Sequence, residues 1–178
     1  MLNAHIKIFI EKAKERSLAQ PIKKLDLSNA GIYDNDVQDL LSYLKQIKYT
    51  PTCLNLDDNN IGDAGLKLLA DFKEIEEINL DRNNITNVGL AALETRQNLD
   101  LKRLNLNRNN LKSNHPSGNL VELISAYQGI ILIEITMGND ASLEELQRIK
   151  EIQQQQTVYS VGQQEKLVQG IKRNLFRQ

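Results

Sequence analysis

An eight-residue pattern of apolar and polar positions recurs along the middle of the chain. It reads LDLSNAGI, LNLDDNNI, INLDRNNI and LNLNRNNL, and a weaker fifth copy reads IEITMGND. Apolar residues at positions 1 and 3 point to one face of a short strand, while positions 2 and 4 point to the other. The pattern therefore predicts five strands, near residues 25–28, 54–57, 78–81, 104–107 and 132–136.

The segments between the copies have the spacing of helices. Leu66, Leu69 and Phe72 follow the second copy at intervals of three residues, which places them on one helical face. Successive copies begin 29, 24, 26 and 29 residues apart, enough for one strand and one helix each. The fourth copy is followed by KSNHPSG, with Pro116 inside it, so its helix is expected to begin late. The units are expected to stack as a solenoid.

Position 6 of the pattern holds an asparagine in the second, third and fourth copies: Asn59, Asn83 and Asn109. A side-chain amide both donates and accepts hydrogen bonds, so it can satisfy backbone groups in its own turn and in the adjacent turn. We therefore expect these residues to form a ladder between the repeats.

These units resemble the leucine-rich repeats of the ribonuclease-inhibitor-like subclass, whose unit is similar to L-x-L-x-x-N-x-I-x-D-x-G. Asp63 with Gly65 and Asn87 with Gly89 match the second half of that unit, whereas Asp36 stands where the first repeat would have glycine. The resemblance implies an α/β fold. It would be a short right-handed horseshoe with about five parallel strands on its concave face and helices on its convex face.

Both ends of the chain are predicted to cap the solenoid, because its terminal units would otherwise expose apolar edges. Residues 1–20 form the predicted N-terminal capping helix, residues 21–140 the repeats, and residues 141–178 a C-terminal helical cap. The apolar face of the first helix is expected to consist of Ile6, Phe9, Ile10 and Ala13.

The C-terminal cap is predicted to contain two helices. Ser142 and Glu145 have the spacing of a capping box, and the apolar face of the helix that follows is expected to hold Leu143, Leu146 and Ile149. The last helix would carry Leu167, Ile171 and Leu175.

Composition limits the possible functions of the chain. It has 178 residues, one cysteine and a formal net charge of -1, so one domain without a disulfide is expected. Residues 25–140 hold ten Lys/Arg and seventeen Asp/Glu, while both ends are basic. The longest apolar run, at 130–133, is far too short to span a bilayer. A cytoplasmic location is expected, since no secretory signal is recognisable.

Outward-facing strand positions should stack into columns, with neighbours about 4.8 Å apart. Such a face would measure roughly 19 by 17 Å, less than the about 800 Å² per partner of a standard interface, so rim loops or an end helix should join the contact. The candidate partner-binding residues are Asn55, Asp57, Asn79, Asp81, Arg82, Arg103, Asn105, Asn107, Arg108 and Glu134.

Arg108 has a distinctive expected environment. In its column Asp58 lies beside Arg82, and Arg108 lies between Arg82 and Met137. Two like charges on adjacent strands are mildly destabilising. With no acidic neighbour, Arg108 is predicted to face an acidic or carbonyl-rich patch on a partner.

The chain carries no convincing catalytic or cofactor motif. Cys53 would need a histidine within hydrogen-bond reach to act as a nucleophile, and His5 and His115 are predicted to lie elsewhere. Asp57 and Asp81 come with no His or Cys cluster that would indicate a metal site. No phosphate-binding loop or aromatic stacking platform for nucleic acid occurs. We therefore expect a protein that is not an enzyme, with no cofactor, metal, nucleic-acid or membrane partner.

The predicted function is binding of another protein, such as a host or bacterial enzyme, by a chain that is monomeric by itself. The resemblance to ribonuclease inhibitor implies inhibition by covering the partner's active surface, and the alternative is an adaptor that recruits a partner without inhibiting it. The size and composition also resemble the short leucine-rich-repeat effectors of Legionella-type intracellular bacteria. That resemblance implies translocation into the cytosol of a host cell.

Overall fold

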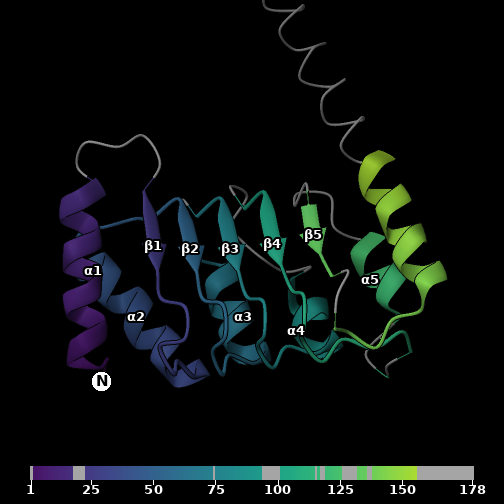
Figure 1. The fold of residues 1–178 in the computed structure, drawn as a ribbon, viewed down its shortest axis with the longest axis horizontal. Helices are drawn as coiled ribbons and strands as arrows, with labels where there is room; N and C mark the ends of the chain where they lie inside the picture. Colours follow the sequence, from purple (N-terminus) through teal and green to yellow (C-terminus); the bar gives the residue numbers. More distant parts are fainter. Residues whose placement is uncertain are drawn as a thin grey trace, which may run out of the picture.

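The computed structural model describes residues 2–17, 23–73, 75–93, 101–114, 116, 119–125, 132–135 and 138–155. The expected last helix, with Leu167, Ile171 and Leu175, lies outside them. Five parallel strands form one sheet in chain order (Figure 1). They are β1 Lys24–Asp26, β2 Cys53–Asn55, β3 Glu77–Asn79, β4 Arg103–Asn105 and β5 Leu132–Glu134.

One face of the sheet is covered by helices, and the other is open (Figure 1). The covering helices are α2 Asp34–Gln46, α3 Asp63–Ala70, α4 Asn87–Ala92 and α5 Leu120–Ser125. Apolar residues at the centre of each strand pair in register, and all are buried against these helices: Leu25, Leu54, Ile78, Leu104 and Ile133. The predicted α/β leucine-rich-repeat solenoid is thus confirmed.

The helix of the fourth repeat begins late, as expected. α5 begins at Leu120, fifteen residues after β4 ends, whereas α3 begins eight residues after β2 ends. Among the described residues no helix combines the length and apolar character needed to cross a membrane.

The predicted asparagine ladder is present. Asn59 Oδ1 accepts hydrogen bonds from the backbone N–H groups of Ala30 (3.1 Å) and Ile32 (2.9 Å) in the preceding repeat. Its Nδ2 donates to the carbonyl oxygens of Leu27 in that repeat (3.0 Å) and Leu56 in its own (2.9 Å). Asn83 and Asn109 make equivalent bonds. All three are buried, so each ties two turns together where water cannot solvate the backbone.

The fifth repeat is one residue longer in this turn than the eight-residue frame predicts. Position 6 of that frame is Gly138, but Asn139 continues the ladder. Its Oδ1 accepts from Leu111 N (3.1 Å), and its Nδ2 donates to Leu106 O (3.0 Å). The residue before each ladder asparagine has a left-handed backbone, with φ of 56° at Asp58 and 52° at Arg108, and Gly138 takes this place with φ of 68°.

Gly138 lies directly against Arg108. A Cβ atom on Gly138 would lie 2.7 Å from Cγ of Arg108, so Gly138 packs against that side chain. Met137 itself lies outside the described residues. Only glycine accommodates both the contact and the backbone conformation without strain.

The N-terminal cap is α1, Ala4–Ser17, which stands beside β1 (Figure 1). Ile6 and Ile10 are buried, and Lys14 Nζ donates to Ile47 O in the first repeat (2.7 Å). The expectation that Phe9 belongs to the packed face is wrong, because its side chain is 64% exposed. The first repeat covers only the narrow stripe around Ile6 and Ile10, and Phe9 lies at its margin.

The C-terminal cap begins with the predicted capping box. Ser142 N donates to Glu145 Oε2 (3.1 Å), and Glu145 N donates to Ser142 Oγ (3.2 Å). The helix over residues 143–155 stands at the β5 end (Figure 1). Ile149 is 2% exposed, and Gln153 Nε2 donates to Ile133 O of β5 (2.8 Å).

Leu143 does not join this packed face, contrary to expectation, since it is 87% exposed. Six residues separate it from Ile149, which places it about 120° away around the helix. The two side chains therefore allow a matched test of the cap.

We expect Ile149→Ala to lower the free energy of unfolding by about 2–5 kcal/mol, because it removes buried apolar surface and leaves a cavity. Leu143→Ala should change it by less than about 0.5 kcal/mol. Urea unfolding followed by circular dichroism measures both variants. Equal effects would mean that this helix does not seal the end of the solenoid.

Candidate functional site

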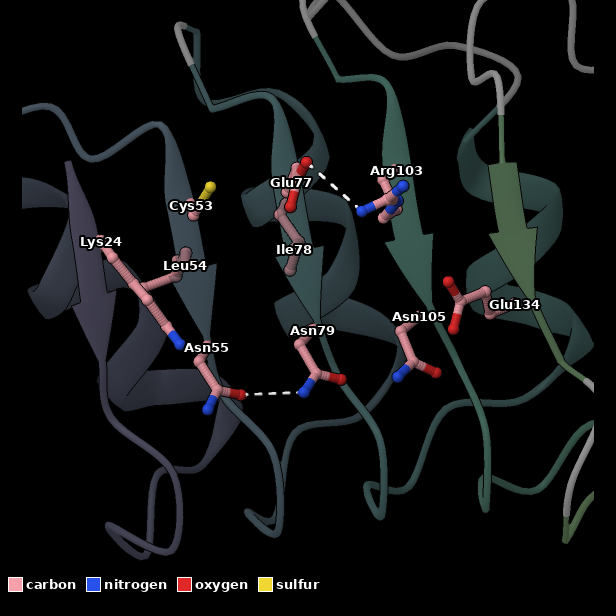
Figure 2. A pocket seen from close by; sticks show the side chains of 10 residues that line it. All are labelled: Lys24, Cys53, Leu54, Asn55, Glu77, Ile78, Asn79, Arg103, Asn105 and Glu134. Carbon is pink, nitrogen blue, oxygen red and sulfur yellow. Dashed lines mark hydrogen bonds and ion pairs between the residues drawn. The ribbon is translucent and has the colours of Figure 1, made fainter. Parts of the chain in front are cut away.

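The open face of the sheet carries the two predicted columns of outward side chains. The strand register places Lys24, Cys53, Glu77, Arg103 and Leu132 in one column, and Asp26, Asn55, Asn79, Asn105 and Glu134 in the next. A hollow of about 220 Å³ runs over them from Lys24 of β1 to Glu134 of β5 (Figure 2). We call it the sheet hollow. It makes the open face concave.

The asparagines of the second column are bonded to one another along the left part of the hollow. Asn79 Nδ2 donates to Asn55 Oδ1 (3.0 Å, Figure 2), and Asn55 Nδ2 donates to Asp26 Oδ1 (2.9 Å). Asn55 Oδ1 also accepts from Asp57 N, and Asn79 Oδ1 from Asp81 N. These amides therefore help to end the strands as well as line the hollow.

The row of hydrogen bonds between side chains does not continue at the right end of the hollow. Asn105 Oδ1 accepts from Asn107 N (3.0 Å), but its Nδ2 and the carboxylate of Glu134 bond to no described residue. Both side chains project into the hollow (Figure 2). A donor and an acceptor are thus available next to each other on β4 and β5.

The first column holds a loose ion pair. Arg103 and Glu77 approach to 3.5 Å with side chains 53% and 46% exposed (Figure 2). An exposed pair of this kind contributes little to stability. Its two charges can be re-directed to a bound molecule at small cost. Sequence reasoning did not count Lys24 or Glu77 among the candidate residues, although their column positions already placed them on this face.

A second row of ion pairs lies beyond the strand ends. Arg82 pairs with Asp57 at 2.7 Å, and Arg108 pairs with Asp81 at 2.5 Å, each arginine reaching back to the preceding repeat. The prediction that Arg108 lacks an acidic neighbour is wrong, because its long side chain reaches diagonally to Asp81, in a different column. The Asp57 and Asp81 side chains are only 19% and 12% exposed, so these carboxylates lie beneath the arginines.

The predicted site residues thus fall into two groups. Asp81 and Asn107 are buried, and Asp57 is covered by Arg82. The accessible members are Asn55, Asn79, Arg103, Asn105 and Glu134 in the sheet hollow, with Arg82 and Arg108 along its edge.

Cys53 lies in the sheet hollow next to Glu77. Burial, followed by the nearby carboxylate of Glu77, raises the pKa of its thiol, which keeps the unreactive protonated form. His5 lies on α1, and His115 is outside the described residues. Within the described part of the chain no three His, Cys, Asp or Glu side chains are grouped as metal ligands.

Comparisons with known proteins agree with this architecture. A family model described as leucine-rich repeat matches residues 52–70 and 75–93. The solved structure of leiomodin-1 actin-binding site 2 superposes with a TM-score of 0.64 at 16% identity, covering 97% of this chain and 99% of that one. The C-terminal domain of Caenorhabditis elegans tropomodulin gives 0.55 at 16% identity, covering 91% and 98%. No curated protein sequence matches the chain.

The repeat match and the two superpositions agree with the observed sheet and helices on the fold. The chain has a leucine-rich-repeat fold.

Cys53 should react slowly with iodoacetamide at mildly alkaline pH compared with a cysteine in an unstructured peptide, because its raised pKa reduces the thiolate fraction. Glu77→Gln should accelerate the reaction by removing a negative charge. Mass spectrometry of timed samples measures both rates. A rate for Cys53 above that of the peptide would contradict the assignment of an inert thiol.

Arg108→Glu should lower the free energy of unfolding by about 1–3 kcal/mol, because it leaves the buried carboxylate of Asp81 without its partner. Arg103→Glu should cost less than about 1 kcal/mol, since Glu77 is half exposed. Denaturant titration of both variants tests this order. Equal losses would show that burial of Asp81 does not strengthen its ion pair.

Proposed function

We propose that this chain binds a partner protein through its sheet hollow. The observation that supports this most directly is the pair formed by Asn105 and Glu134, whose polar groups are open in a surface where neighbouring polar groups are already bonded. A partner that donates to Glu134 and accepts from Asn105 Nδ2 would complete their hydrogen bonding. The loose Arg103–Glu77 pair next to them offers charges for the same contact.

The chemistry of the hollow indicates a peptide or polar protein surface as the bound molecule. Amides, two carboxylates, an ammonium group and a guanidinium lie on the sheet, so they are positioned before the partner arrives and lose little entropy on binding. We keep Arg82 and Arg108 as edge contacts of this interface. The side chains of Arg82 and Arg108 are 47% and 41% exposed in their ion pairs.

We propose that binding inhibits the partner by covering its active surface, as the likeness to ribonuclease-inhibitor-like repeats implies. The alternative is an adaptor that recruits a partner and leaves its activity intact. Assay of the partner's activity with and without a saturating amount of this chain separates the two. We further propose, from the size and amino-acid usage, that the chain is a bacterial effector that acts in the cytosol of a host cell.

Actin is a defined first partner to test. The leiomodin-1 structure is described as an actin-binding site, and the superposition spans nearly all of both chains. At this level of identity the likeness shows the fold alone, so co-sedimentation with filaments and titration of monomeric actin are needed before any partner is assigned.

Glu134→Arg and Arg103→Glu should each weaken capture of the partner by about tenfold or more if they lie at the centre of the interface. Lys67→Glu is the matched control, because Lys67 is exposed on α3 on the opposite face of the solenoid. Affinity capture from host and bacterial lysates, followed by calorimetry with the purified partner, measures the losses. Equal binding by all variants would exclude the sheet hollow as the interface.

A further inference from the structure

A second hollow, of about 230 Å³, lies between the N-terminal cap and the first repeat. We call it the cap hollow. Its lining comes from the first two turns of α1 and the residue before them, and from β1 and the turn after it. The lining residues are Asn3, His5, Ile6, Phe9, Asp26, Leu27, Ser28, Asn29 and Ala30.

The floor of the cap hollow is apolar, and one wall is an exposed aromatic ring. Ile6 and Leu27 are buried, while Phe9 is 64% exposed. α1 is already held to the first repeat by Ile10 in the core and by the bond from Tyr43 Oη to Glu11 Oε1 (2.8 Å). The ring of Phe9 is therefore not needed to attach the cap. Its large apolar surface is available to a bound molecule.

The polar side of the cap hollow carries one carboxylate, that of Asp26, of which one oxygen makes all the hydrogen bonds to described residues. Oδ1 of Asp26 accepts from Ser28 N (3.1 Å), Ser28 Oγ (2.8 Å) and Asn55 Nδ2 (2.9 Å). Oδ2 bonds to no residue in the described part of the chain, and Asp26 forms no ion pair there. Asp26 lines the cap hollow and is held by the three bonds to Oδ1, so Oδ2 is the oxygen with capacity to accept from a bound molecule.

Asp26 is ionised at neutral pH. Partial burial raises its pKa, but hydrogen bonds from Ser28 and Asn55, together with the charge of Lys24, outweigh that effect and hold the pKa below its ordinary value. Lys24 lies on the same face but lines the sheet hollow, not the cap hollow. Asp26 is the only carboxylate among the residues that line the cap hollow, so its negative charge favours a cation there.

We propose that the cap hollow receives a lysine side chain of the bound protein. The methylene stem would lie along Phe9 and the apolar floor, and the ammonium group would bond to Oδ2 of Asp26. Lysine fits better than arginine, because a guanidinium needs two carboxylate oxygens for its bidentate geometry and Asp26 offers one. An anionic side chain would be repelled by Asp26.

The cap hollow extends the proposed interface beyond the strands. Asn55 lines the sheet hollow and donates to Asp26 of the cap hollow, so the two are joined by a direct hydrogen bond. This inference rests on the proposed function, because the lysine belongs to the partner protein. It also supplies the end-helix contact that the small area of the strand face requires.

The test uses a defined probe, Nα-acetyl-lysine methylamide, titrated into the full isotope-labelled chain and followed by NMR. We expect saturable shifts confined to Phe9, Asp26 and Ser28 and their neighbours. The norleucine analogue, which lacks the ammonium group, and the arginine analogue should bind more weakly. Equal or tighter binding of either analogue would overturn the proposal, as would shifts scattered over the surface.

Two pairs of variants sharpen the test. Asp26→Asn keeps an oxygen to accept from Ser28 and Asn55, so the fold should persist, and it should weaken the probe roughly two- to fivefold. Asp58→Asn, which removes an exposed charge of the next repeat outside the lining, should leave probe binding unchanged. Phe9→Ala should weaken the probe by a similar factor, whereas Ile8→Ala, an exposed neighbour outside the lining, should not. Equal effects within either pair would refute the site, and thermal melts confirm that each variant is folded.

The inference and the proposed function can fail separately. If the probe binds as expected but no partner is held by the sheet hollow, the proposed function is wrong as stated. If a partner is held and Asp26→Asn and Phe9→Ala both leave its affinity unchanged, the lysine site is wrong and the sheet hollow remains the interface.

Discussion

The structure depends on the satisfaction of backbone polar groups in the turns between stacked repeats. Each strand has only three residues, so the sheet alone leaves many N–H and carbonyl groups of the following turn buried and unpaired. Asn59, Asn83, Asn109 and Asn139 supply the missing donors and acceptors from one repeat to the next. A buried amide without such a bond costs about 1–3 kcal/mol.

A second set of side chains does the same work at the helix starts. Asp34 Oδ1 accepts from Gly62 N (2.7 Å) and Gly65 N (3.1 Å), and Asp63 accepts from Thr86 N. A Cβ atom at Gly65 would lie 2.6 Å from Asp34 Oδ1, so the glycine is required by the close approach of the preceding carboxylate. The repeats are therefore joined both after their strands and at the starts of their helices, and successive units are held in a fixed register.

This bonding decides which polar groups are left for a partner. Polar side chains that support the stack, such as Asp81 paired with Arg108, are already engaged. Groups at the two ends of the open face keep polar atoms that bond to no described residue. They belong to Asn105 and Glu134 on β4 and β5, and to Asp26 on β1. The polar atoms that remain for a partner are thus those that no bond within the described residues uses, such as Asn105 Nδ2 and Asp26 Oδ2.

The amino-acid sequence by itself determined the fold class, the strand register and the asparagine ladder. Each follows from local spacing: alternation sets the faces of a strand, and a fixed repeat length sets which residues align between strands. The sequence also identified half of the residues that line the sheet hollow, because outward positions in successive repeats must form columns. It could not predict the partner of Arg108, since a long side chain can reach a different column of the adjacent repeat.

The environment of single side chains at the ends of the solenoid was decided only by the tertiary structure. Helical spacing grouped Phe9 with Ile6 and Leu143 with Ile149, but the width of the surface that each cap covers left Phe9 and Leu143 exposed. The shift of the ladder position to Asn139 was likewise not predicted, because a frame counted along the chain cannot show where an extra residue is inserted. Periodicity determines what repeats, whereas the cap hollow arises where the repeats end, from the packing of a helix against the first unit.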